Sequence, residues 1–321
     1  MFGSTSAPGS TAPTSDTGKA SVETTRPAAS RSRYAGAGLA AVAALALSGC
    51  SSEELSRGFL PSESVGATNF TPMIQDLWNG SWIAALGVGV IVWGLTIWCV
   101  IAYRRRQGDP EVPPQLRYHL PLEVMYTAIP LFMVAVLFYY TATSQAAILN
   151  LEEEPDHTVE VVAKQWSWDF NYVDEDVYET GVQAALDGQE GAEERIPTLV
   201  LPVDERVEFV LFARDVNHSF WIPAFLFKMD HIAGRENRFQ VVPTKEGTFQ
   251  GKCAELCGEY HSEMLFNVEV VSREEYDEYI QGLEDAGQTG QLGTDLNRSG
   301  VIDVDEGRTG GEITGNGRNE N

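Results

Sequence analysis

Two long apolar runs stand out in the first half of the chain. The first covers Ser81–Tyr103 and is followed by three arginines, Arg104–Arg106, and the second covers Leu120–Thr143. At about 1.5 Å per residue, each run is long enough to cross a hydrocarbon core of about 30 Å as a helix. Arginines collect on the cytoplasmic side of such spans. We therefore predict a transmembrane hairpin over 81–143, with both flanking regions outside the cytoplasm.

After Asn150 the long runs give way to short segments in which apolar and polar residues alternate. Glycine, proline, aspartate and asparagine separate these segments, a pattern typical of a β-sandwich or barrel. We predict an all-β domain over 150–271, in which Asp174–Glu194 is an exposed loop. The expected strands are Thr158–Ala163, Leu199–Leu201, Arg206–Phe212, Arg238–Val242, Thr248–Lys252 and Phe266–Val271.

The start of the chain has the composition of a targeting segment. Its first part is rich in Ser, Thr, Ala and Pro, and a short apolar run then ends in the sequence Leu-Ser-Gly-Cys at Cys50. This pattern resembles a bacterial lipoprotein signal. We predict a signal peptide over 1–49, a lipid on Cys50 and an extracytoplasmic linker over 50–80. A plain signal peptide with an incidental Cys50 is the alternative.

The end of the chain is predicted to be a short helix followed by a tail. Ser272 and Glu275 have the spacing of a capping box, which starts a helix over 272–284. Residues 285–321 are polar and glycine-rich, so we expect a disordered acidic tail.

The net charge of −24 lies entirely in residues 151–321, which hold 37 acidic and 13 basic residues. Such a region repels nucleic acid and attracts basic partners. We therefore expect no nucleic-acid partner, although the acidity also serves to keep an exported domain in solution.

Four soft or borderline metal donors, Cys253, Cys257, His261 and Met264, lie close together between two predicted strands. Thiolate, thioether and imidazole together favour copper. A disulfide between the cysteines is one alternative, but it leaves His261 and Met264 without a role. Zinc is another, although a thioether is a poor zinc ligand. The chain lacks the CxxCH motif of covalently bound haem.

A symmetric two-metal site needs a second histidine, and His218 is the candidate. It follows the predicted strand Arg206–Phe212, whereas His231 and His157 are weaker competitors. A lone histidine at the end of a strand is usually structural, so this assignment depends on the donors further along the chain.

Taken together, these residues resemble the CuA motif of cytochrome c oxidase subunit II. The resemblance rests on Asp215–Ser219, on Cys253–Met264 and on the preceding hairpin, and it covers roughly Met73–Val271. It implies a cupredoxin-like Greek-key domain that holds two copper ions bridged by two cysteines. The implied copper ligands are His218, Cys253, the main-chain carbonyl of Glu255, Cys257, His261 and Met264.

The same resemblance implies roles for residues around the copper loop. The Glu255 side chain would bind magnesium or manganese shared with subunit I. Trp166 would receive electrons, with a buried core position as the alternative. Glu123 would lie at the mouth of a proton channel in subunit I, unless it only reaches the membrane interface. Three acidic residues would help to dock a basic cytochrome c: Asp174, Asp176 and Asp215.

The implied function is that of subunit II in a cytochrome c oxidase of a bacterial plasma membrane. Electrons would pass from cytochrome c through the copper centre to haem in subunit I, where oxygen is reduced and protons are pumped. Subunits I and III would be the partners in the membrane. A related quinol oxidase subunit lacks the copper ligands, and the CuA domain of nitrous oxide reductase belongs to a soluble enzyme. A lipid-anchored copper-binding or assembly protein is the main alternative.

Overall fold

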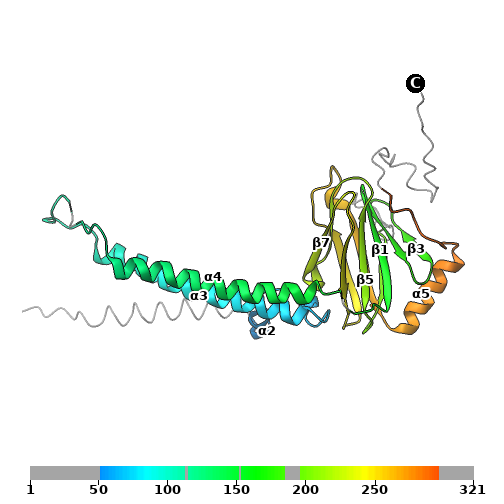
Figure 1. Cartoon of the computed structure of the whole chain (residues 1–321), viewed down its shortest axis with the longest axis horizontal. Coiled ribbons are helices and arrows are strands. Elements are labelled where there is room, and N and C mark those ends of the chain that lie inside the picture. Colours follow the sequence, from blue (N-terminus) through cyan, green and yellow to red (C-terminus); the bar gives the residue numbers. More distant parts are fainter. Residues whose placement is uncertain (1–50, 113–114, 152, 185–195, 296–321) are drawn as a thin grey trace, which may run out of the picture. The chain divides into compact units, whose positions relative to one another are not determined.

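The computed structural model describes residues 51–112, 115–151, 153–184 and 196–295. The predicted signal peptide, Cys50 and residues 296–321 of the tail lie outside the described residues. The two long helices in the described part are α3 (Thr71–Ala102) and α4 (Leu120–Ile148), and both are long and apolar enough to cross a membrane (Figure 1).

Helix α3 begins at Thr71, well before the predicted span at Ser81. Its first turns carry polar side chains that bind the short helix α2 (Ser52–Arg57) and the turn after it. Trp78 Nε1 donates to the Gly58 carbonyl at 2.8 Å, and Asn79 Nδ2 donates to the Ser56 carbonyl at 2.8 Å. These contacts extend α3 toward its N-terminus, beyond the apolar run. Only the apolar run can be recognised in the sequence.

The region after α4 forms two five-stranded sheets, ordered β3-β2-β1-β5-β8 and β4-β10-β9-β6-β7. Strands β1 and β5 pair in parallel, as do β4 and β10, while the other pairs are antiparallel. This confirms the predicted fold class, two apolar helices followed by an all-β, cupredoxin-like sandwich. The strands are β1 (His157–Lys164), β2 (Ser167–Tyr172), β3 (Val177–Thr180), β4 (Thr198–Pro202), β5 (Val207–Ala213), β6 (His218–Ile222), β7 (Phe227–His231), β8 (Asn237–Val241), β9 (Gly247–Cys253) and β10 (Leu265–Val271).

Aromatic side chains fill the space between the two sheets. Phe220 and Phe266 stack with ring centroids 4.9 Å apart, and Trp168 meets the edge of both rings. Trp168 is 0% exposed. The core therefore lies directly beneath the starts of β6 and β10, and it provides a rigid base for the loops there.

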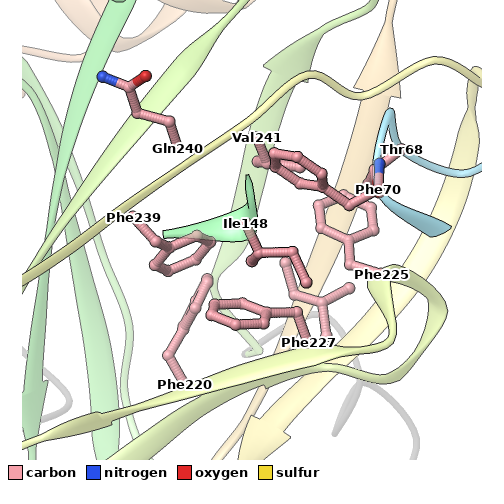
Figure 2. Close-up of a pocket in the computed structure, with 10 residues that line it drawn as sticks. Thr68, Phe70, Ile148, Phe220, Phe225, Phe227, Phe239, Gln240 and Val241 are labelled. Atoms are coloured by element: carbon pink, nitrogen blue, oxygen red, sulfur yellow. The ribbon is translucent and has the colours of Figure 1, made fainter. Parts of the chain in front are cut away.

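Helix α4 ends against this core. Its last residue, Ile148, lies among Phe220, Phe227 and Phe239, and Phe70 lines the same apolar pocket (Figure 2). The chain segments that enter α3 and leave α4 thus meet at one apolar joint with the sandwich.

Two sequence predictions need correction at the outer edge of the first sheet. The predicted loop Asp174–Glu194 contains strand β3, in which Val177 is fully buried. The predicted tail begins with an ordered segment, Gln288–Leu292, that hydrogen-bonds along β3 and to Asn171 of β2. Polar composition concealed both features, because their stabilising bonds are mainly bonds to main-chain groups.

Helix α5 (Arg273–Asp285) begins at the predicted capping box and packs against β3 and β4. Buried His157, at the start of β1, lies beneath it. The ring nitrogens of His157 lie 2.7 Å from a Glu175 oxygen and 2.8 Å from a Glu205 oxygen. Tyr276 and Arg273 of α5 bind these same carboxylates. His157 therefore links the sandwich to α5 through two carboxylates.

We expect this link to make folding stability depend on pH. Burial opposes protonation of His157, but the bonds to Glu175 and Glu205 outweigh it and raise its pKa. The stabilisation is therefore complete below the unfolded pKa of about 6.5 and is lost as pH rises through the raised folded pKa. Denaturant unfolding of the chain and of its His157→Gln variant should give a stability difference that shrinks from acid to alkaline pH.

Groups remote from His157, such as His218, contribute equally to both proteins. Burial raises the pKa of Glu175, but its bonds, above all that to His157, lower this pKa by more. Glu175 therefore titrates on the acid side, so the difference above neutral pH reports on His157. A stability difference that stays constant as pH rises from about 6.5 into the alkaline range would contradict a charged link, since the folded pKa of His157 is raised.

Candidate metal centre

The predicted copper donors converge at one end of the second sheet. His218 is the first residue of β6, Cys253 is the last residue of β9, and Met264 precedes β10. Cys257 and His261 lie on the loop between β9 and β10. Because β9 pairs with both β6 and β10, the sheet register brings together residues that are far apart in the sequence.

The two cysteine sulfurs form the middle of the cluster. Both cysteines are free thiols, with their Sγ atoms 3.9 Å apart, so the disulfide alternative is not seen. His218 Nδ1 lies 3.9 Å from Cys253 Sγ, and the Glu255 carbonyl oxygen lies 3.2 Å from the same sulfur. On the other side, Cys257 Sγ lies 3.6 Å from His261 Nδ1 and 3.8 Å from Met264 Sδ.

These donors fit copper better than the other metals considered. All side-chain donors are sulfur or imidazole nitrogen, and the sulfurs of Cys253 and Cys257 can both lie between two ions. His218, Cys253 and Cys257 are buried and place one donor atom each within 4.8 Å of one another. A hydrogen bond between the two thiols lowers the pKa of Cys253 and raises that of Cys257, so one proton would be lost before the other. Metal ions would replace both protons.

Asp215 holds the ring of His218 from behind, a role that the sequence analysis did not predict. Its Oδ1 lies 2.8 Å from His218 Nε2, and its Oδ2 accepts the Gln165 main-chain N–H at 2.7 Å. Burial raises the pKa of the Asp215 carboxyl, but its hydrogen bonds lower that pKa by more. The pKa of Asp215 is therefore lower than its usual value. Asp215 is 8% exposed. These contacts orient the His218 ring, as groups around metal sites commonly do for ligands, while the docking role of Asp215 stays a prediction.

His231, the competitor of His218, lies outside the cluster of donors. It pairs with His218 across β6 and β7 and is fully buried, and its Nε2 lies 3.2 Å from the Val161 carbonyl oxygen. Burial lowers the pKa of His231 to about 3, so the ring is neutral. The other competitor, His157, belongs to the link beneath α5.

Trp166 lies in the turn between β1 and β2, beside the metal loop. The ring is partly exposed and packs edge-on against Tyr260, with centroids 4.9 Å apart. A side chain at Gly258 would place its Cβ 3.0 Å from Trp166 Nε1. Trp168, by contrast, lies in the core, so the two tryptophans that looked alike in sequence occupy different surroundings.

The remaining predicted site residues lie apart from the donors. The Glu255 side chain is exposed beside Leu256 on the metal loop. Glu123 caps the start of α4, where its Oε1 accepts the His119 main-chain N–H at 2.9 Å. Asp174 and Asp176 are exposed at the end of β2 remote from Trp166. Their docking role stays a prediction.

Comparison with known proteins places this geometry in a family. The chain is 44% identical over 274 residues to "Probable cytochrome c oxidase subunit 2" of Streptomyces coelicolor, covering 76% of this chain and 84% of that protein. The chain belongs to the cytochrome c oxidase subunit 2 family. A family profile described as "Cytochrome C oxidase subunit II, periplasmic domain" matches residues 157–271, which hold every donor described above.

Two further proteins are similar to this chain. The subunit 2 sequence of Mycobacterium bovis is 34% identical over 287 residues, covering 74% of this chain and 78% of that protein. The crystal structure of the periplasmic domain of subunit II (CoxB) from Bradyrhizobium japonicum is 30% identical, with a TM-score of 0.38, covering 42% of this chain and 97% of that chain. As a member of this family, the chain is a subunit of a cytochrome c oxidase.

Proposed function

We propose that the cluster is a binuclear CuA centre through which this subunit receives electrons from cytochrome c and passes them to haem in subunit I. The observation that carries the proposal is the paired arrangement of donors around two free thiols. His218 lies on the Cys253 side, and His261 lies on the Cys257 side. When bound, the copper pair would supply a one-electron acceptor whose charge is shared between two ions.

The chain's own residues explain how such a site is kept ready. Asp215 fixes the His218 ring so that Nδ1 faces the sulfurs, and the aromatic core holds β6 and β10 in place. The Trp168 indole N–H points to the Met264 carbonyl at 3.4 Å. A rigid cage of this kind limits rearrangement when the charge of the site changes, which favours rapid transfer.

Trp166 is the proposed point of electron arrival. It is partly exposed, and it lies against the loop that carries Cys257 and His261. An electron-donating protein that docks over the Trp166 ring would come close to the metal loop without entering the core of the domain. The acidic residues of the domain favour a basic partner, and Asp174 and Asp176 belong to this wider field.

The membrane part extends the proposal to partners and location. Subunits I and III would pack on the hairpin, and the Glu255 carboxylate would hold magnesium or manganese at the boundary with subunit I. Glu123 would lie beside the mouth of a proton channel. The sandwich would lie outside the plasma membrane of a bacterium, with the mature chain anchored by a lipid on Cys50.

The test is to purify the full chain in detergent, add copper, and measure copper content and the paramagnetic resonance spectrum. We expect two copper ions per chain and an unpaired electron split by two equivalent copper nuclei. His218→Asn should give a single-copper or otherwise altered spectrum, whereas His231→Asn should keep the paired signal. Zinc in place of copper, or equal loss from both variants, would overturn the proposal.

A further inference from the structure

One turn of the sandwich is bonded to both halves of the donor cluster. This turn, Gln165–Trp166, connects β1 to β2. The Gln165 main-chain N–H donates to Asp215 Oδ2 at 2.7 Å, and Asp215 Oδ1 lies 2.8 Å from His218 Nε2. The Gln165 side-chain Nε2 donates to the Cys257 carbonyl at 2.6 Å.

These bonds join segments that the fold brings together from a distance. Gln165 is 50 residues from Asp215 and 92 residues from Cys257 along the chain. Gln165 lies in the turn between β1 and β2 of the first sheet, whereas Cys257 lies on the loop that follows β9 of the second sheet. Asp215 lies between β5 of the first sheet and β6 of the second. Gln165 therefore joins the two sheets at the mouth of the site, where the metal loop leaves β9.

The next residue, Trp166, rests on the loop that Gln165 holds. Its ring meets Tyr260 at a centroid distance of 4.9 Å. Gly258 lies beneath it with φ +138°, and a Cβ there would lie 3.0 Å from both Trp166 Nε1 and Gln165 Nε2. Only glycine combines this backbone conformation with such a close approach. Tryptophan, glutamine and metal loop thus form one close-fitting contact.

We propose that Gln165 is a positioning residue for electron acceptance, which holds Trp166 and the Cys257 half of the site at a fixed separation. The inference rests on the proposed function, because Trp166 matters only if electrons arrive through it. Gln165 binds no metal in this scheme. It acts through the Cys257 carbonyl and through Asp215, and the rate of transfer depends on the geometry that these bonds keep.

The side-chain bond can be removed without touching the main-chain bond. Gln165→Leu keeps the size of the side chain and loses its donor, and Gln165→Glu keeps the shape but presents an acceptor to the Cys257 carbonyl. Both retain the main-chain N–H to Asp215. Gln250→Leu is the matched control, because Gln250 is exposed in β9 and is not one of the metal-donor residues or their hydrogen-bond partners described above.

The first measurement uses the assembled oxidase and follows reduction of the copper site by reduced cytochrome c. We expect both Gln165 variants to keep two copper ions and an unchanged KM, while the rate constant per loaded centre falls about tenfold, since small displacements at reacting groups have effects of this size or larger. An unchanged rate constant at full copper content would overturn the inference. So would a rate that falls only in proportion to lost copper, which is the behaviour of a purely structural residue.

The second measurement needs no copper. In the metal-free full chain, iodoacetamide alkylation of Cys257 and Cys253 can be followed separately by mass spectrometry. Gln165→Leu should speed alkylation of Cys257 about fivefold, the factor expected for one lost hydrogen bond, with a smaller change at Cys253. Equal rates in Gln165→Leu and the Gln250→Leu control would overturn the inference. Absence of paired copper in the unmodified chain would instead refute the proposed function.

Discussion

Replacing Cys257 with serine is expected to abolish the proposed two-copper site and, with it, the proposed electron transfer from cytochrome c. The Cys257 sulfur lies within 4 Å of three other donor atoms, those of Cys253, His261 and Met264. Serine oxygen is a hard donor and does not replace a bridging thiolate. Mutation of a residue that only supports a ligand already lowers metal affinity about 10–100-fold. Loss of the Cys257 sulfur should therefore lower copper affinity by more than about a hundredfold.

Copper content, the paramagnetic spectrum and the rate of reduction by cytochrome c measure this effect together. Cys253→Ser should behave in the same way, because its sulfur occupies the matching place. The control is Cys99→Ser, which alters an exposed thiol on α3 far along the chain from the loop. Retention of a paired spectrum in Cys257→Ser would show that the bridging assignment is incorrect.

The largest effect on stability is expected from Trp168→Ala. Trp168 is 0% exposed and contacts Phe220, Phe266 and His231 at centroid distances between 5.2 and 5.8 Å. Truncation of a buried tryptophan costs about 3–5 kcal/mol because the cavity closes only in part. The free energy of unfolding should fall by this amount, and the copper site should loosen because the contact with the Met264 carbonyl is lost.

Trp221→Ala provides the comparison, because Trp221 lies on the outer face of the second sheet, on β6. Trp221 is only partly buried, and its main polar contact is the Lys252 ammonium 4.7 Å from the ring. We expect a loss of about 1 kcal/mol or less. Equal losses of unfolding free energy in the two variants, measured by denaturant titration, would mean that the core is centred elsewhere than on Trp168.

The metal loop was readable from the sequence because its donors are nearly consecutive and chemically unusual. Cys253, Cys257, His261 and Met264 need only one loop to meet, whereas His218 needs the pairing of β6 with β9. The hairpin was equally readable, since long apolar runs have few other interpretations. Six strands were also predicted, because their short runs either alternate between apolar and polar residues or are wholly apolar between turn residues.

What the sequence concealed is long-range pairing of polar groups. Strand β2 alternates polar and aromatic residues like a half-buried strand, yet both of its faces are buried, including Asp169 and Asn171. In the sequence Asp215 looked like a surface charge, but inside the protein its carboxylate is hydrogen-bonded to Gln165 and His218. Such pairings depend on how the two sheets meet, and residue spacing carries no information about that.

The ordered start of the C-terminal segment sets a practical limit on how the chain can be shortened. Thr289 bridges to Val177, and Gln288 and Gly290 add main-chain hydrogen bonds along the outer strand of the first sheet. A version cut after Asp285 would leave that strand open to neighbouring molecules. Such a version should self-associate during purification, whereas one that retains Leu292 should stay monodisperse.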